Sequence, residues 1–186
     1  RKHGKDSNFY RIRVLGLPPT VGTQELIPWD WVMDAVEREV SPMDDDPLIF
    51  IIDVGAGGDD TALCRRRGPQ VMPFEVTNIA ESEQLTSWIL RRILTDEPRF
   101  AFIDPIGVGW GIAGHLRDRL KRDTTEIIEV NVAEIAAEDV KFSRLRDELW
   151  WKTREEFEAR PISIPDDPLL IEELTAIKVD QERLDG

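Results

Sequence analysis

Short apolar runs, each closed by polar or glycine-rich residues, dominate the chain from residue 47 onward. Their length and their content of β-branched and aromatic residues predict strands at 48–53, 60–66, 70–77, 99–104 and 126–132. Apolar residues at helical spacing predict helices at 81–94, 111–121, 143–158 and 168–174. Three adjoining strands followed by strand–helix alternation are typical of an α/β protein. The pattern therefore predicts a mixed sheet with an antiparallel flank.

The first 46 residues follow a different pattern. YRIRVLG (10–16) alternates like a strand, and Pro28 opens a predicted helix that runs to Val40. SPMDDDP (41–47) is an acidic, proline-bounded linker. We therefore expect a connecting segment over 1–46 and the main domain over 47–186.

Composition narrows the functional classes. The chain has 186 residues and a formal net charge of −13, which argues against a general binder of polyanions. It contains no apolar run long enough to cross a membrane and no signal-peptide core near its first residue, so no membrane partner is expected. Cys64 is the single cysteine, which fits a reducing compartment. A cytoplasmic setting is expected.

Two predicted strands end on aspartate and continue into glycine-containing loops, at Asp53 and at Asp104. If both strands are central and parallel, their carboxyl ends lie at the same sheet edge, where α/β sheets bind ligands. Paired carboxylates repel one another unless a cation lies between them, and oxygen ligands of this kind suit Mg²⁺ or Mn²⁺. The alternative is that each aspartate only caps a turn or a helix. The matched pair favours a metal site.

The loop after Asp53 is glycine-rich, with Gly55, Gly57 and Gly58. These glycines allow the backbone to fold back tightly as a hairpin. Asp59 and Asp60 then return beside Asp53. The alternative is an ordinary hairpin turn of the Asp-Gly type.

GWGIAG (109–114) offers a competing interpretation, because it satisfies the dinucleotide-binding pattern G-x-G-x-x-G between a strand and a helix. Asp123 or Glu129 could then serve as the ribose-binding acid. However, Asp104 and Pro105 intervene where that pattern runs directly from strand to glycine turn. His3 and His115, the only histidines, are too far apart in sequence to suggest a zinc motif.

Arg65, Arg66 and Arg67 end the second predicted strand. Arginines at a hairpin tip can solubilise an exposed edge, or they can bind phosphates through paired donors. We expect this triplet to lie at an exposed tip and to contribute to DNA binding rather than to the fold. Trp150 and Trp151 lie in a helical pattern that favours packing over base stacking.

Taken in order, three segments resemble the C-terminal nuclease domain of the large terminase subunits of tailed phages or prophages, the motors that package viral DNA. They are DVGAGGDDTAL (53–63), FIDPIGVGWGIAGHL (102–116) and KFSRLRDELWWKTREEF (141–157). DSNFYRIRVLGLPP and ELIPWDWVMDAV resemble the segment that leaves the ATPase domain of that family. The resemblance covers nearly the whole chain.

The resemblance implies a ribonuclease-H-like fold and cleavage of double-stranded concatemeric DNA with two divalent metal ions, Mg²⁺ or Mn²⁺. It implies that Asp53 and Asp104 are metal ligands and that Asp59 is an additional catalytic acid. Such domains carry a further aspartate near the C-terminus, which we expect beyond Gly186; Asp180 and Asp185 are assigned no role.

The implied partners are double-stranded DNA, the terminase ATPase domain, the small terminase subunit and the portal protein, in the cytoplasm of a bacterial host. The alternatives are a dinucleotide-binding oxidoreductase domain and a non-catalytic docking module of the packaging motor.

Overall fold

The computed structural model describes residues 25–55, 59–104, 107, 109–121, 124–159 and 161–179. The chain divides into two compact units, each described by itself below. Residues 41–148 form the sheet unit, and the helical unit comprises residues 1–40 and 149–186, of which 25–40, 149–159 and 161–179 are described. The predicted strand at 10–16 lies outside the described residues.

The sheet unit is built on six strands, as far as the structure describes it. They are β1 (Leu48–Asp53), β2 (Thr61–Arg67), β3 (Gln70–Val71), β4 (Glu75–Thr77), β5 (Phe100–Ile103) and β6 (Glu126–Glu129). The order across the sheet is β3-β2-β1-β5-β6, and β4 also pairs with β2. Strands β1 to β4 pair in antiparallel fashion, whereas β5 lies parallel to β1 and to β6. The predicted mixed sheet with an antiparallel flank is confirmed.

The third predicted strand, 70–77, is two short strands instead of one. Pro73 lies in the gap between β3 and β4 and has no N–H to donate to a strand ladder. The turn before β3 contains Gly68 at a positive φ of 53°, a conformation that glycine adopts without strain.

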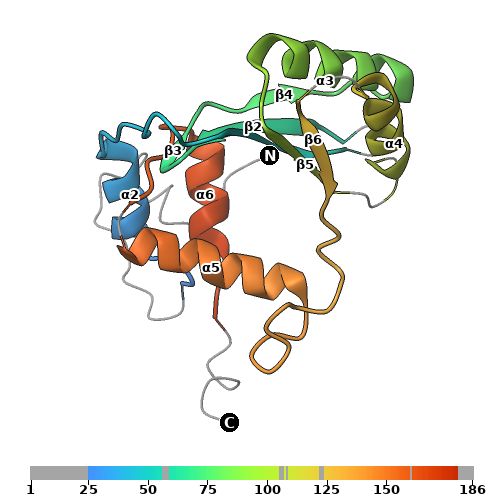
Figure 1. Cartoon of the computed structure of the whole chain (residues 1–186). Helices are drawn as coiled ribbons and strands as arrows, with labels where there is room; N and C mark the ends of the chain where they lie inside the picture. The colour runs from blue at the N-terminus through green and yellow to red at the C-terminus, as the bar shows by residue number, and fades with distance from the viewer. Residues whose placement is uncertain are drawn as a thin grey trace. The chain divides into compact units, whose positions relative to one another are not determined.

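Helices α3 (Ser82–Asp96) and α4 (Gly109–Arg119) lie side by side over one face of this sheet, as Figure 1 shows. Alternate strand residues point into the core between sheet and helices, for example Phe50 and Ile52 from β1 and Ile103 from β5. They meet Ile89 of α3 and other fully buried helix residues. This packing follows from the period of two along the strands and fixes which side chains face away from the helices.

The helical unit contains α2 (Trp29–Glu37), α6 (Pro168–Ala176) and most of α5 (Leu145–Ala159), which crosses the division at residue 149. The N–H of Leu26 donates to the carbonyl of Ile177 at 2.8 Å. The guanidinium of Arg154 stacks over Trp31 at 5.2 Å and over Trp151 at 5.1 Å. Within the described residues, no helix combines the length and the apolar character that a membrane span needs.

Candidate active site

The carboxylates predicted at two strand ends belong to adjacent parallel strands. Ile52 of β1 is in register with Ile103 of β5, so Asp53 and Asp104 are the next residues on neighbouring strands. The N–H of Asp104 donates to the carbonyl of Ile52 at 3.3 Å, which continues the ladder up to this point. Since Ile52 and Ile103 are buried toward α3 and α4, alternation directs Asp53 and Asp104 to the other face of the sheet. The two carboxylates therefore share one edge and one face.

The electrostatics of Asp53 support this pairing. Its pKa is raised above the ordinary value, first by partial desolvation and second by the negative charge of Asp104. A carboxylate pair of this kind destabilises its own ionised form and would gain from a cation between the oxygens. The donor set, carboxylate oxygens alone, fits Mg²⁺ or Mn²⁺.

The loop after Asp53 makes a close backbone approach that requires glycine. A Cβ atom on Gly55 would overlap with the carbonyl oxygen of Asp59 and lie 2.6 Å from that of Asp60. Because the obstacle is backbone, no side-chain rotation could relieve it. The N–H of Gly55 donates to the hydroxyl of Thr61 at 3.0 Å. Gly57 and Gly58 lie outside the described residues.

Asp59 is exposed and follows the part of this loop that is not described. Among the described residues, no three His, Cys, Asp or Glu side chains are grouped closely enough to hold a metal ion. The structure thus brings Asp53 and Asp104 together, and Asp59 does not complete a set of three with them. Asp180 and Asp185 lie outside the described residues.

The glycines of GWGIAG have different environments. A Cβ atom on Gly109, the first residue of α4, would overlap with the carbonyl oxygen of Asp104. Cβ atoms on Gly111 and Gly114 would meet no other atom within 4 Å. In a dinucleotide fingerprint the third glycine allows close helix–strand packing, and Gly114 makes no such contact. Gly109 lets α4 begin directly against the second carboxylate strand.

The arginine triplet lies at the opposite end of β2 from the carboxylates, because Ala62 pairs with Asp53 and Arg67 with Leu48. Arg65 bonds to Glu75 at 2.6 Å and to Asp96 at 2.7 Å, and its guanidinium stacks over Phe50. The expectation that the triplet lies at an exposed tip and does not contribute to the fold is therefore wrong for Arg65.

The two other arginines of the triplet make local bonds. Arg67 donates to the backbone carbonyls of Asp44 and Asp46, and Arg66 donates to the carbonyl of Gly68 at 2.9 Å. By alternation, Arg66 lies on the same sheet face as Ala62 and Asp53, whereas Arg65 and Arg67 lie on the face of α3 and α4. Among the three, Arg66 alone shares a face with the carboxylates. The role of the triplet in DNA binding stays a prediction.

Sequence reasoning missed Thr61. Its side chain is 1% exposed and faces the core, in the alternation position of Leu63. A hydroxyl in a core-facing position of a strand that begins beside a carboxylate was the available signal, because a buried polar group needs a partner.

The fold of this chain was compared with those of known proteins. No family model and no curated protein matches this chain. Among solved structures, the nuclease domain of the large terminase subunit gp2 of bacterial virus Sf6 superposes with a TM-score of 0.70 at 15% identity. That match covers 84% of this chain and 83% of the Sf6 chain.

Other solved structures agree with this result. The large terminase nuclease from thermophilic phage G20c with bound magnesium matches with a TM-score of 0.60 at 14% identity, over 84% of this chain and 82% of that one. A K428A mutant of the Sf6 domain with manganese has a TM-score of 0.67 at 14% identity, over 81% of both chains. The chain therefore has the ribonuclease-H-like fold of the terminase nuclease domains, as the sequence resemblance implied.

Proposed function

We propose that this chain is the nuclease domain of a phage or prophage large terminase subunit. In this proposal it cuts double-stranded concatemeric DNA during genome packaging and depends on Mg²⁺ or Mn²⁺. The observation that carries the proposal is the pair Asp53 and Asp104, which end adjacent parallel strands on one face of a sheet with the fold of the terminase nucleases. The solved neighbours with manganese and magnesium support a divalent ion.

The roles of the residues follow from their chemistry. Asp53 and Asp104 would hold the metal ions through their carboxylate oxygens. A bound pair of ions supplies activation of a water for in-line attack and stabilisation of the departing 3′ oxygen. Asp59 remains the proposed additional catalytic acid, and an aspartate beyond Gly186 remains the proposed further ligand.

Phosphate contacts beside the site are proposed for the arginine triplet, and Arg66 is its best placed member because it shares the sheet face of Asp53. Arg66 lies four positions along β2 from Ala62, the partner of Asp53, which is about 13 Å along a strand. That length corresponds to roughly four base pairs of duplex DNA.

The remaining expectations rest on the resemblance and stay part of the proposal. They are a connection to an ATPase domain through residues 1–46, a nuclease domain over 47–186, and partners that include the small terminase subunit and the portal protein. The proposed site of action is the cytoplasm of a bacterial host.

The direct test is cleavage of supercoiled plasmid by a chain extended past Gly186. We expect nicked and linear products with Mg²⁺ or Mn²⁺, and none with a chelator. Asp53→Asn and Asp104→Asn should both abolish cleavage because each removes a proposed ligand. Asp118→Asn is the matched control, since that exposed carboxylate lies on α4 and pairs with Lys121. Cleavage by Asp53→Asn at the parental rate, or cleavage in chelator, would contradict the proposal.

The alternatives predict other outcomes. A dinucleotide-binding domain would bind a nicotinamide or flavin cofactor and show no cleavage, and the open surroundings of Gly114 argue against it. A docking module would show no cleavage even in the extended chain.

A further inference from the structure

Asp53 lies where β1 ends and the glycine-rich loop begins. It and Asp104 follow residues that are in register on β1 and β5, so the two carboxylates share one edge and one face of the sheet. On the Asp104 side the ladder continues, because its N–H donates to Ile52 of β1. On the other side Asp53 pairs with Ala62 of β2, and the chain then enters the glycine-rich loop. A contact that holds the first residues of this loop also restrains the backbone directly after Asp53.

The hydroxyl of Thr61 provides that contact. It accepts the N–H of Gly55, two residues after Asp53, at 3.0 Å. Thr61 is the first residue of β2 and is almost completely buried, so water does not compete for this bond. The bond joins the start of the loop to the first residue of β2. Gly55 also lies close to the carbonyls of Asp59 and Asp60, at the end of the same loop.

The position of Thr61 separates it from any ligand role. Its neighbour Ala62 is the partner of Asp53 across the strands, and alternation turns the Thr61 side chain to the opposite, core-facing side. Its hydroxyl therefore acts on Asp53 only through the backbone of Gly55.

We propose that Thr61 is a positioning residue of the metal site: by holding the Gly55 N–H from the core side, it fixes the direction of Asp53. This inference rests on the proposed function, since it assumes that the carboxylate pair binds a divalent cation. Groups that orient metal ligands in this way contribute about 10–100-fold to metal affinity in other proteins.

The test compares Thr61→Val, which keeps the shape and removes the hydroxyl, with Thr61→Ser, which restores it. The matched control is Thr86→Val, because Thr86 is also a fully buried threonine whose hydroxyl bonds to a backbone carbonyl, that of Ser82 within α3. Two quantities are measured by NMR on each folded variant and on the parental chain, all extended past Gly186. They are the hydrogen-exchange rate of the Gly55 amide and the dissociation constant for Mn²⁺ from line broadening near Asp53.

We expect Thr61→Val to speed exchange at Gly55 and to weaken Mn²⁺ binding about 10–100-fold. Thr61→Ser and Thr86→Val should keep the parental values for both quantities. Parental Mn²⁺ affinity in Thr61→Val would overturn the positioning role while leaving the proposed function intact. No Mn²⁺ binding by the parental chain would overturn the proposed function, and this inference with it.

Discussion

At the scale of single residues, the site depends on two carboxylates that the fold places close together at an energetic cost. Asp53 has a raised pKa because of partial desolvation and the charge of Asp104. The folded state thus holds this proton more tightly than the unfolded chain does. The free energy of unfolding therefore falls as pH rises from the ordinary value of 3.8 through the raised folded pKa, and the loss persists above it.

Replacing Asp53 by asparagine should remove this loss. Above the folded pKa we expect Asp53→Asn to melt at the same or a higher temperature than the parental chain in metal-free buffer. Below pH 3.8 the advantage should vanish, because Asp53 is then protonated in both states. Thermal melts across this pH range measure the effect. Asp118→Asn should show no such gain, because Lys121 lowers the pKa of Asp118. A lower melting temperature for Asp53→Asn at neutral pH would contradict the repulsion argument.

Gly109 allows a second prediction at this scale. A Cβ atom there would overlap with the carbonyl oxygen of Asp104, and neither backbone can move without disturbing β5 or α4. We expect Gly109→Ala to lower the free energy of unfolding by about 1–3 kcal/mol. Gly111→Ala, two residues along the same helix and open to space, should raise it by about 0.5–1 kcal/mol. Urea unfolding of both variants measures these changes in the free energy of unfolding. Equal changes for Gly109→Ala and Gly111→Ala would contradict the contact between Gly109 and the carbonyl of Asp104.

How far the site could be predicted differs from residue to residue. Asp53 and Asp104 could be predicted because a carboxylate at the end of a buried strand contrasts with the apolar run before it. The bond from Gly55 to Thr61 could not be predicted, because a hydroxyl in a strand does not indicate from which backbone N–H it accepts. The position of Asp59 depends on a loop whose path no periodicity specifies.

At the scale of secondary structure elements, the apolar pattern predicted the strands beside the site well. β1 and β5 lie where the apolar runs are, because these runs are buried in the middle of the sheet. The edges were less predictable. β3 and β4 divide a predicted strand at Pro73, and β6 ends at Glu129 instead of residue 132. Edge segments are determined by local chemistry and by pairing more than by burial.

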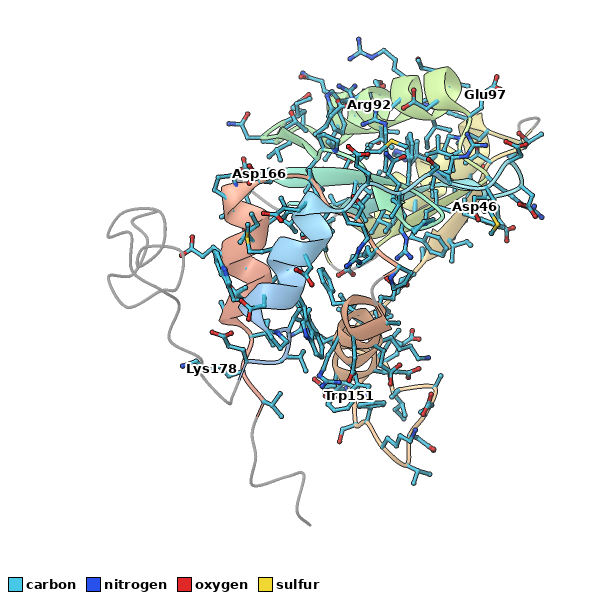
Figure 2. All side chains as sticks on the ribbon, turned by 90° about the vertical axis from the view of Figure 1, so that its left-hand side faces the viewer. Asp46, Arg92, Glu97, Trp151, Asp166 and Lys178 are labelled. Atoms are coloured by element: carbon cyan, nitrogen blue, oxygen red, sulfur yellow. The ribbon has the colours of Figure 1, made fainter. Side chains whose placement is uncertain are left out.

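The partners of Arg65 also escaped prediction, because they come from two other elements. Glu75 of β4 accepts hydrogen bonds from Arg65 and from Arg92 of α3. Arg92 is labelled in Figure 2. The second partner of Arg65 is Asp96, the last residue of α3. The pKa of Glu75 is lowered. Desolvation, the largest single contribution, raises this pKa, but the side-chain bonds to Arg92 and Arg65 and the charges of both arginines together outweigh it. This network joins the edge strand β4 and the helix α3 to β2.

We expect Arg65→Ala to lower the free energy of unfolding by about 1–2 kcal/mol, since it removes charge-assisted bonds that are only partly shielded from water. Arg67→Ala, which removes exposed bonds to backbone carbonyls, should change it by about 0.5 kcal/mol or less. Chemical denaturation of the two variants provides the comparison. If Arg65→Ala were as stable as Arg67→Ala, the network would not support the fold.

At the scale of the whole molecule, the apolar runs predicted the mixed sheet with its antiparallel flank, and the resemblance of the ordered motifs implied the ribonuclease-H-like fold. Strands β1 to β4 form the antiparallel flank, and β5–α4–β6 is a parallel strand–helix–strand unit. The division into a sheet unit and a helical unit was not predictable, because it joins residues 1–40 to residues 149–186. Contacts between segments so far apart in sequence leave no periodic signal.

The net charge of −13 gives the last prediction its physical basis. An acidic chain binds DNA only where local cations offset the general repulsion, so a single arginine near the site should have a measurable effect. Arg66 shares the sheet face of Asp53, whereas Arg67 lies on the opposite face and donates to the carbonyls of Asp44 and Asp46. The two neighbouring arginines therefore form a matched pair.

We expect Arg66→Ala to weaken binding to two unrelated duplexes by a similar factor, because a phosphate contact carries no base information. The slope of log affinity against log salt concentration should become shallower by about 0.9, the value for one lost phosphate contact. Arg67→Ala should keep the parental slope. Fluorescence anisotropy between about 50 and 200 mM salt, the range over which counterion release is strong, measures both variants. Equal slopes for Arg66→Ala and the parental chain would show that DNA does not run along this face of β2, and phosphate contacts would then have to come from another element.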